Sequence, residues 1–193
     1  MALVFVTSDK YMIKAIKTLT TIILTSTVAC FSYGDGTAHN QWSESTRSVT
    51  SSVHEEIDKG GLLHLLSLRI SHSSDGRQRI YFQRFSREFV FNNKTDSVDE
   101  RDLDTCNSAD FRSVKIIKIG NQAIKAFAWC NKIKELDANS LMMTAETELG
   151  HRFILDSLYP GLFNINVEVD GISFSVPSAG FSKAWRASGG NAP

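Results

Sequence analysis

The stretch between Cys106 and Cys130 constrains the fold of this chain more than any other feature. An apolar-rich run over 114–119 is followed by Gly120-Asn121 and then by a second apolar-rich run over 122–129. Two such runs joined by a Gly-Asn link predict a β-hairpin with a tight turn. The two cysteines flank this hairpin, so their relation decides whether its ends are tied together.

The hairpin register brings the two cysteines close. Ile119 pairs with Gln122 across the turn, which places Phe111 opposite Cys130. A short turn upstream of Phe111 can then fold Cys106 back beside Cys130, and cysteines whose Cα atoms lie within about 7 Å can be bridged. We therefore predict a disulfide between them. The alternative is two unpaired, buried cysteines that behave as small apolar residues.

Residues 1–34 have the layout of a secretory signal peptide. Two lysines precede an uncharged run over 19–31, and small residues precede a cleavage position between Gly34 and Asp35. This is the order of basic region, apolar region and cleavage site that export signals show. A true start at Met12 would give the basic region a more ordinary length.

Other readings of this segment remain open. The apolar run is too short and too rich in threonine for a stable transmembrane span, which needs about 20 mostly apolar residues. It could instead form a buried or interfacial helix, or end in an acylated Cys30 that anchors a lipoprotein. Export to the periplasm or the outside is the expectation, and an oxidising compartment favours the disulfide.

Charge and motifs restrict the function classes. The chain carries 21 lysines and arginines against 21 aspartates and glutamates. Its overall charge therefore does not steer it to nucleic acid. It contains no Cys-x-x-Cys pair, phosphate loop, dinucleotide fingerprint or paired-histidine metal helix. We expect no cofactor, no metal and no nucleic-acid partner, and no motif designates a catalytic residue.

A second hairpin is predicted over 62–72 and 77–85. Its register pairs Ile70 with Ile80 on a face that can line a core. The opposite face carries the candidate partner-binding residues Arg69, Arg77, Arg79 and Tyr81. Arginines interleaved with a tyrosine suit an anionic group or an acidic protein surface. A merely solvated sheet face is the alternative.

An acidic segment and a helix follow. We predict a solvated loop over 94–110, where aspartates and glutamates are frequent. A helix is predicted over 145–159, with Thr144 as its N-cap. Its expected core stripe is Leu149, Phe153, Ile154 and Leu158, and His151 falls off that stripe, on the surface.

The C-terminal part contains a third hairpin. Asp170-Gly171 joins two runs of alternating apolar residues and pairs Val169 with Ile172. Pro177 ends the second strand, and a short helix follows it.

These elements predict an α+β fold. An antiparallel sheet of about six or seven strands, built from three hairpins, is packed by one main helix and a short C-terminal helix. We expect a signal peptide over 1–34, a flexible leader over 35–50 and a single domain over 51–193.

Function is less constrained than fold. The first hypothesis is a non-catalytic exported binding module for a protein or an envelope component, a class that includes immunity and inhibitor proteins. The second is a small hydrolase whose site is assembled from distant residues such as His151, Ser182 or the acidic segment. The third is a structural component of the cell envelope, joined through an exposed sheet edge.

Overall fold

The computed structural model describes residues 41–189 apart from 58–59, 93–94, 96, 107–112 and 134–137. The predicted signal peptide and Cys30 lie outside the described residues, as does the expected position of Phe111 opposite Cys130.

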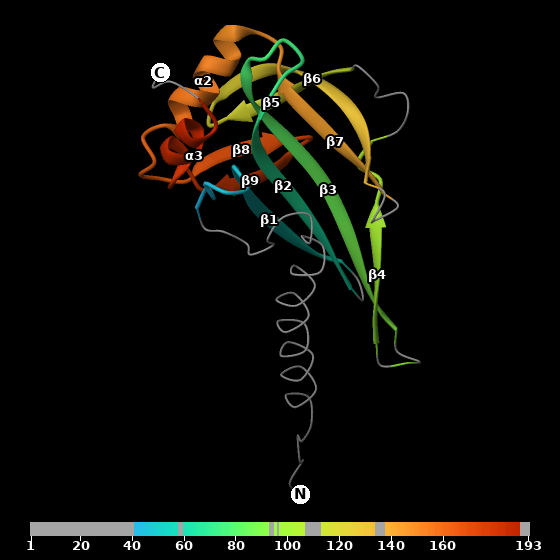
Figure 1. Ribbon diagram of the computed structural model, residues 1–193. Coiled ribbons are helices and arrows are strands. Elements are labelled where there is room, and N and C mark those ends of the chain that lie inside the picture. The colour runs from blue at the N-terminus through green and yellow to red at the C-terminus, as the bar shows by residue number, and fades with distance from the viewer. Residues whose placement is uncertain are drawn as a thin grey trace, which may run out of the picture. The chain divides into compact units, whose positions relative to one another are not determined.

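The described chain is built mostly of strands, with two helices near its C-terminal end (Figure 1). In chain order the elements are β1 (Ser48–Ile57), β2 (Gly60–His72), β3 (Gln78–Asn92), β4 (Ser97–Leu103), β5 (Ser113–Ile119), β6 (Gln122–Ile133), β7 (Ala138–Ala145), α2 (Glu148–Leu158), β8 (Ile165–Val169), β9 (Ile172–Val176) and α3 (Phe181–Ala187).

All nine strands belong to one antiparallel sheet. Their order is β1-β2-β3-β7-β6-β5-β8-β9, and β4 pairs with β3 off this path. The two ends of the order, β1 and β9, lie side by side, and the Ser51 hydroxyl donates to the carbonyl oxygen of Ser175 at 2.8 Å. The sheet therefore curls into a nearly closed, barrel-like form.

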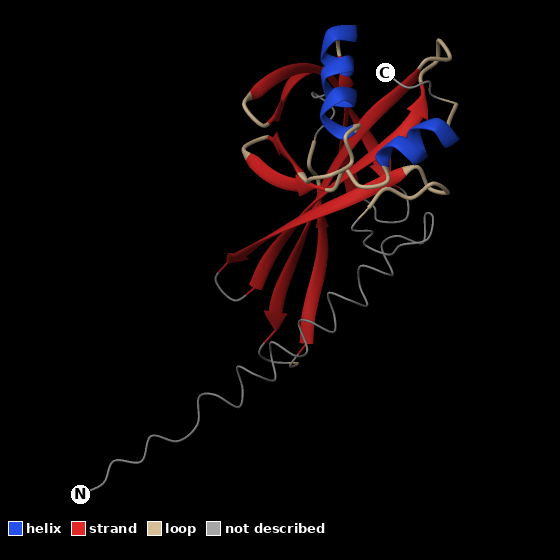
Figure 2. Ribbon diagram, turned by 90° about the vertical axis from the view of Figure 1, so that its left-hand side faces the viewer, coloured by secondary structure: helices blue, strands red, loops and turns tan. Residues whose placement is uncertain are grey.

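The strand β3 divides this sheet into two parts. Residues 81–84 of β3 pair with β7 inside the barrel, whereas residues 86–92 pair with β4. The end of β1 and the far halves of β2 and β3, together with β4, extend beyond the barrel as an arm (Figure 2).

The predicted α+β fold with six or seven strands and one main helix is wrong. The structure has nine strands in a barrel-like sheet, including β1 and β4, which the sequence does not reveal. The predicted acidic loop over 94–110 contains β4. Most residues of this strand are charged, so it lacks the alternating apolar pattern that usually indicates a strand. Arg87 of β3 donates to Asp102 at 2.6 Å and to Glu100 at 2.9 Å across the strand pair.

The three predicted hairpin registers are confirmed. Ile70 pairs with Ile80 in the first, Ile119 with Gln122 in the second and Val169 with Ile172 in the third. Each pairing is local to a turn, and turn chemistry fixes register in hairpins. At the third turn both Asp170 and Gly171 have positive φ angles, 49° and 81°.

The helix α2 begins later than predicted. Its N-cap is Thr147, whose hydroxyl accepts from the Gly150 amide at 3.0 Å. Thr144, the predicted cap, is a buried residue of β7 and donates to the carbonyl oxygen of Ile80 at 3.0 Å. The helix therefore starts at Glu148 instead of 145.

The buried face of α2 also differs from the predicted stripe. Ile154 and Leu158 are fully buried, but Leu149 is 82 % exposed and Phe153 is 38 % exposed. His151 is buried instead, in contact with Trp185 at a ring-centroid distance of 6.1 Å. Residues 151, 154 and 158 have the same helical spacing as the predicted stripe, so periodicity alone did not distinguish the two faces.

Trp42 ties the start of the described chain to its end. Residues 35–50 were expected to form a flexible leader, yet Trp42 is only 3 % exposed. Its indole N–H donates to the Pro177 carbonyl at 3.0 Å, and its ring meets Phe181 edge-on with centroids 4.9 Å apart. A Cβ on Gly180 would lie 2.9 Å from the Trp42 carbonyl oxygen, so only glycine fits beside it.

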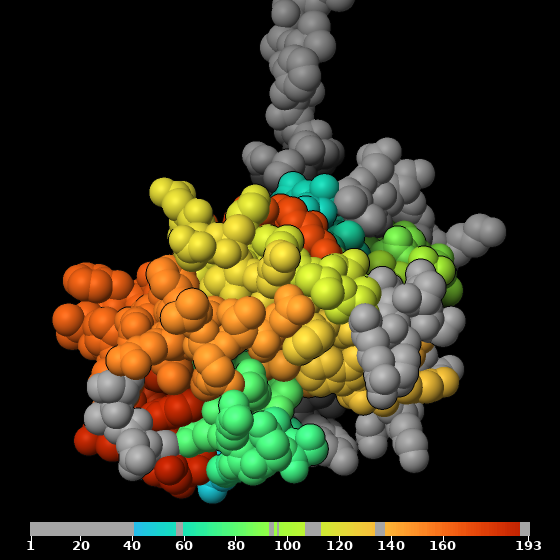
Figure 3. Space-filling view, turned by 90° about the horizontal axis from the view of Figure 1, so that it is seen from above, coloured from blue at the N-terminus to red at the C-terminus, as the bar shows by residue number. Residues whose placement is uncertain are grey.

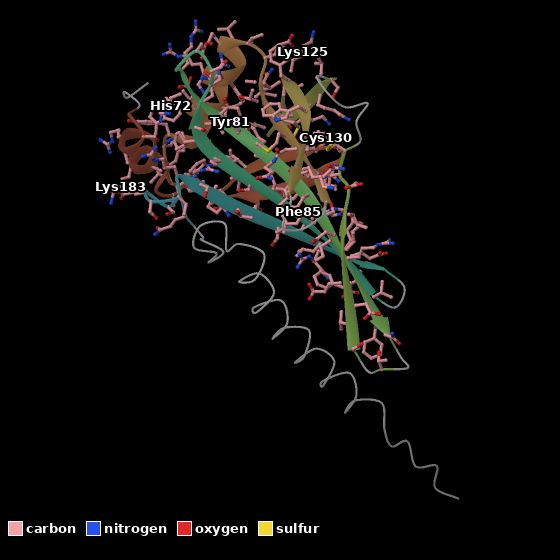
Figure 4. The ribbon with its side chains drawn as sticks, turned by 45° about the vertical axis from the view of Figure 1, so that its right-hand side comes forward. His72, Tyr81, Phe85, Lys125, Cys130 and Lys183 are labelled. Atoms are coloured by element: carbon pink, nitrogen blue, oxygen red, sulfur yellow. A yellow bond between two sulfur atoms is a disulfide. The ribbon has the colours of Figure 1, made fainter. Side chains whose placement is uncertain are left out.

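Cys106 and Cys130 form a disulfide with a Cα–Cα distance of 5.7 Å. The bond joins the segment after β4 to β6, and Figure 4 shows it at the labelled Cys130. Because Cys106 is also part of the buried core, the bridge fixes this irregular segment against the barrel.

Removing the disulfide should destabilise the domain substantially. The bridge closes a loop of 24 positions, and its loss frees that loop in the unfolded chain. We expect the double variant Cys106→Ala/Cys130→Ala to lose roughly 3 kcal/mol of unfolding free energy, measured by urea titration. Reductant should weaken the wild type to the same level and leave the variant unchanged. Equal midpoints for oxidised and reduced wild type would contradict a stabilising bridge.

Candidate functional site

The strand registers place one row of residues across the outer face of the sheet. Arg69 pairs with Tyr81, Tyr81 with Thr144, Thr144 with Phe127, and Phe127 with Val114. The row crosses β2, β3, β7, β6 and β5 in turn. It therefore connects the predicted arginine and tyrosine face to side chains that are distant in sequence.

An aromatic contact joins this row to the next one. Trp129 pairs with Met142, which pairs with Gln83, and the Trp129 ring meets Tyr81 edge-on with centroids 6.0 Å apart. We call the following six residues of β3, β5, β6 and β7 the outer band: Tyr81, Val114, Ile116, Phe127, Trp129 and Met142.

Three residues of the outer band leave large apolar surface in solvent. Val114 is 54 % exposed, Phe127 48 % and Ile116 46 %. Val114 and Phe127 are direct cross-strand partners, and Ile116 lies two residues further along the same face, opposite Lys125. A contiguous exposed apolar patch of this kind marks an interaction surface more often than a chance feature. The exposed Lys125 lies beside this patch and places a positive charge at its edge.

Two of the four predicted binding residues have partners within the domain. Arg77 and Arg79 both contact one carboxylate oxygen of Glu148 on α2, at 2.9 and 2.7 Å. Arg79 also donates to the Ala145 carbonyl at 3.3 Å. These two arginines therefore position α2 against β3.

The other two predicted residues remain available. Arg69 is exposed and makes no ion pair with any residue that the structure describes. Tyr81 is half-buried beside Trp129, and burial raises the pKa of its hydroxyl, so it stays neutral.

The apolar half of the outer band was missed in the sequence, although a signal for it exists. In the segment Ser113–Ile119 the outward Val114 and Ile116 are as apolar as the inward Ile117 and Ile119. A strand that needs only one buried face normally alternates with polar residues. Apolar residues on both faces therefore indicated either complete burial or an exposed contact surface.

Seen from above, the atoms of α2 and of β6 form neighbouring parts of one surface (Figure 3). The Glu146 amide donates to the Lys125 carbonyl at 2.9 Å, which joins the start of the helix to β6. The start of α2 therefore lies next to Lys125, at the edge of the outer band.

A separate polar cluster lies on the inner face of the sheet. His64 Nδ1 lies 2.7 Å from the Ser86 hydroxyl, and His64 Nε2 lies 3.5 Å from a Glu55 carboxylate oxygen. Arg84, on the same face of β3, donates to Asp170 at 2.7 Å. These residues come from β1, β2, β3 and the turn between β8 and β9, so no sequence motif could have revealed the cluster.

The residues suggested for a hydrolase are not brought together. His151 lies in α2 against Trp185, and Ser182 lies in α3, where its carbonyl accepts from Arg186 at 3.1 Å. No hydrogen bond joins His151 to Ser182 in the part of the chain that the structure describes. The acidic segment over 94–110 contains the strand β4.

No group of three or more histidine, cysteine, aspartate or glutamate side chains among the described residues is arranged to hold a metal ion. None of the helices in the described ranges has the length and apolar character needed to cross a membrane.

Comparisons with protein-family models, with curated proteins and with solved structures found no match for this chain.

The buried His151 should make the domain sensitive to acid. Burial lowers its pKa below the usual value, the Arg79 charge lowers it further, and Glu148 opposes both. The unfolded chain then binds the proton more readily than the folded one. The contribution of His151 to the free energy of unfolding is fully present above about pH 6.5 and is lost as the pH falls toward the depressed pKa.

Replacing His151 tests this coupling. His151→Gln should flatten the fall in unfolding free energy between pH 7.5 and 5, measured by urea titration at each pH. Each pH unit by which burial lowers the pKa corresponds to about 1.4 kcal/mol. The exposed His72 provides the control, and His72→Gln should keep the wild-type slope. Equal slopes in all three proteins would contradict the prediction.

Proposed function

We propose that this protein is an exported binding module that contacts a partner protein through the outer band. The observation that supports this most strongly is the exposed apolar surface of Val114, Ile116 and Phe127. These side chains lie outside the core that holds the domain together. Packing within the domain therefore does not explain why they are apolar. A partner that covers them would remove that surface from water.

The composition of the outer band suggests the chemistry of its partner. Tyr81 and Trp129 supply aromatic surface of the kind that dominates binding energy at interfaces. Lys125 stands beside Ile116, and Arg69 stands beside Tyr81, so cations flank the apolar centre on two sides. A partner surface with apolar side chains surrounded by carboxylates is complementary to it. An immunity or inhibitor protein that covers a toxin or an enzyme would fit this description.

Export rests on two separate features. Residues 1–34 have the order of a secretory signal, and the Cys106–Cys130 disulfide is compatible with an oxidising compartment. An exported domain would meet its partner in the periplasm or outside the cell.

A structural envelope component has less support. That role needs an exposed sheet edge that can accept another strand. Within the described sheet, β1 and β9 lie against each other, and β4 is short and carries Asp99, Glu100, Arg101 and Asp102. Charged, short edge strands are the type that discourages strand addition.

A single exchange on the outer band tests the proposal. Phe127→Ser removes the ring at the centre of the apolar patch and should weaken partner capture from an envelope extract at least tenfold, since hot-spot truncations cost about 1.4 kcal/mol or more. Retention of the partner on immobilised, oxidised protein is the measurement.

The chain offers a closely matched control. Phe91 is also a phenylalanine on a strand and is 41 % exposed, but it lies on the arm, away from the outer band. Phe91→Ser should retain the partner at the wild-type level. Capture that is equal for both variants, or lost only in Phe91→Ser, would overturn the assignment of the binding surface.

A further inference from the structure

The inner face of the sheet holds a histidine and a serine in direct contact. His64 of β2 and Ser86 of β3 are cross-strand partners, and Nδ1 lies 2.7 Å from the serine hydroxyl oxygen. Both residues are buried, at 5 % and 3 % exposure. A base within hydrogen-bond distance of a hydroxyl is the basic requirement for an activated serine nucleophile.

A carboxylate faces the other ring nitrogen. Glu55 Oε2 lies 3.5 Å from His64 Nε2, so a proton on Nε2 points toward the carboxylate. In that tautomer Nδ1 carries the lone pair that accepts the Ser86 proton. The Glu55 side chain is 54 % exposed, so the cluster reaches solvent on this side. Serine, histidine and acid thus stand in the order that nucleophilic catalysis uses.

Burial keeps the imidazole neutral. It lowers the pKa of His64, the hydrogen bond that the ring donates to Glu55 raises it, and the Arg84 charge lowers it again. With its pKa below the usual value, His64 can accept a proton at neutral pH.

Arg84 supplies a donor for developing negative charge. It precedes Ser86 by two residues on the same strand, so both side chains project from the same face. One terminal nitrogen is held by Asp170 at 2.7 Å, but the buried Nε has no hydrogen-bond partner among the described residues. A buried donor of this kind is normally satisfied in a native protein. The Arg84 Nε is therefore an unsatisfied donor on the same face of β3 as Ser86.

We propose that Ser86 is a nucleophile toward activated carboxylic esters with small acyl groups, with His64 as its general base. The small acyl group follows from the burial of Ser86. This activity lies beyond the proposed binding function and does not depend on it, because the outer band and this cluster occupy opposite faces of the sheet.

The reaction balances with the ester and water alone. The Ser86 oxygen attacks the carbonyl carbon while His64 Nδ1 takes the hydroxyl proton, and the Arg84 guanidinium faces the oxyanion. The C–O bond to the alcohol breaks, and the alcohol leaves with the proton from His64. A water molecule, deprotonated by His64, then attacks the acyl-serine ester. The bond to the Ser86 oxygen breaks, that oxygen takes the proton back from His64, and the carboxylic acid leaves.

A covalent probe tests the proposal directly. The whole chain is treated with an alkyl fluorophosphonate, and the modified residue is located by peptide mass spectrometry. We expect a single adduct on Ser86 that is absent from Ser86→Ala. His64→Gln should slow its formation by about 10²- to 10⁴-fold, the usual contribution of a general base. With p-nitrophenyl acetate, the wild-type rate should rise as His64 loses its proton and level off by neutral pH.

Two controls separate catalysis from structure. Ser140 is a fully buried serine that donates to the Asn131 carbonyl at 3.1 Å, and Ser140→Ala should label like the wild type. Glu55→Gln changes a largely exposed side chain, so it should fold normally and label more slowly. Absence of an adduct on Ser86 in the wild type would overturn the proposal. Labelling of Ser86 that is as fast in folded His64→Gln and Glu55→Gln as in the wild type would overturn it as well.

Discussion

The contact between Trp42 and the C-terminal segment is the interaction on which the rest of the structure depends. In a sheet with this strand order, the first and last strands must meet before the core is closed. Trp42 lies just before β1, and its partners Pro177, Ala179 and Phe181 lie just after β9. The hydrogen bonds and ring contact at Trp42 therefore hold together the two ends of a curved sheet and place α3 over the core.

Because the sheet curls on itself, its inner and outer faces have different environments. The inner face carries the core, and it becomes polar toward the arm, with Arg84, Glu55, His64 and Ser86. On the outer face the apolar residues of β2 and β3 toward the arm, such as Leu65 and Phe85, are buried, whereas Phe127 of β6 is exposed. The proposed partner surface and the proposed nucleophile follow from this division, and each can fail without the other.

Local features were predictable from the sequence, and the features that need distant partners were not. Turn residues such as Asp170-Gly171 determined their hairpin registers, because the pairing strands follow directly. The pairing of β3 with β7 joins segments about sixty residues apart, and no local pattern encodes it. The strand β4 was not predicted because it lacks the alternating apolar residues that indicate a strand. Ion pairs from Arg87 to Glu100 and Asp102 join it to β3 instead. Arg69 and Tyr81 were visible in the sequence as candidate contact residues. Val114, Ile116 and Phe127 share one predicted hairpin, but only the strand order places that hairpin on the same face as Tyr81.

The most direct test of the closed sheet is the unfolding free energy of Trp42→Ala. If Trp42 is part of the core, its removal should cost about 3–5 kcal/mol in a urea titration, the usual loss for a large buried aromatic side chain. Leu162→Ala, at a position that is 75 % exposed, should change the same quantity by no more than about 0.5 kcal/mol. A loss below about 1 kcal/mol for Trp42→Ala would mean that the chain before β1 is the loose leader that its composition suggests, and that the sheet closes without it.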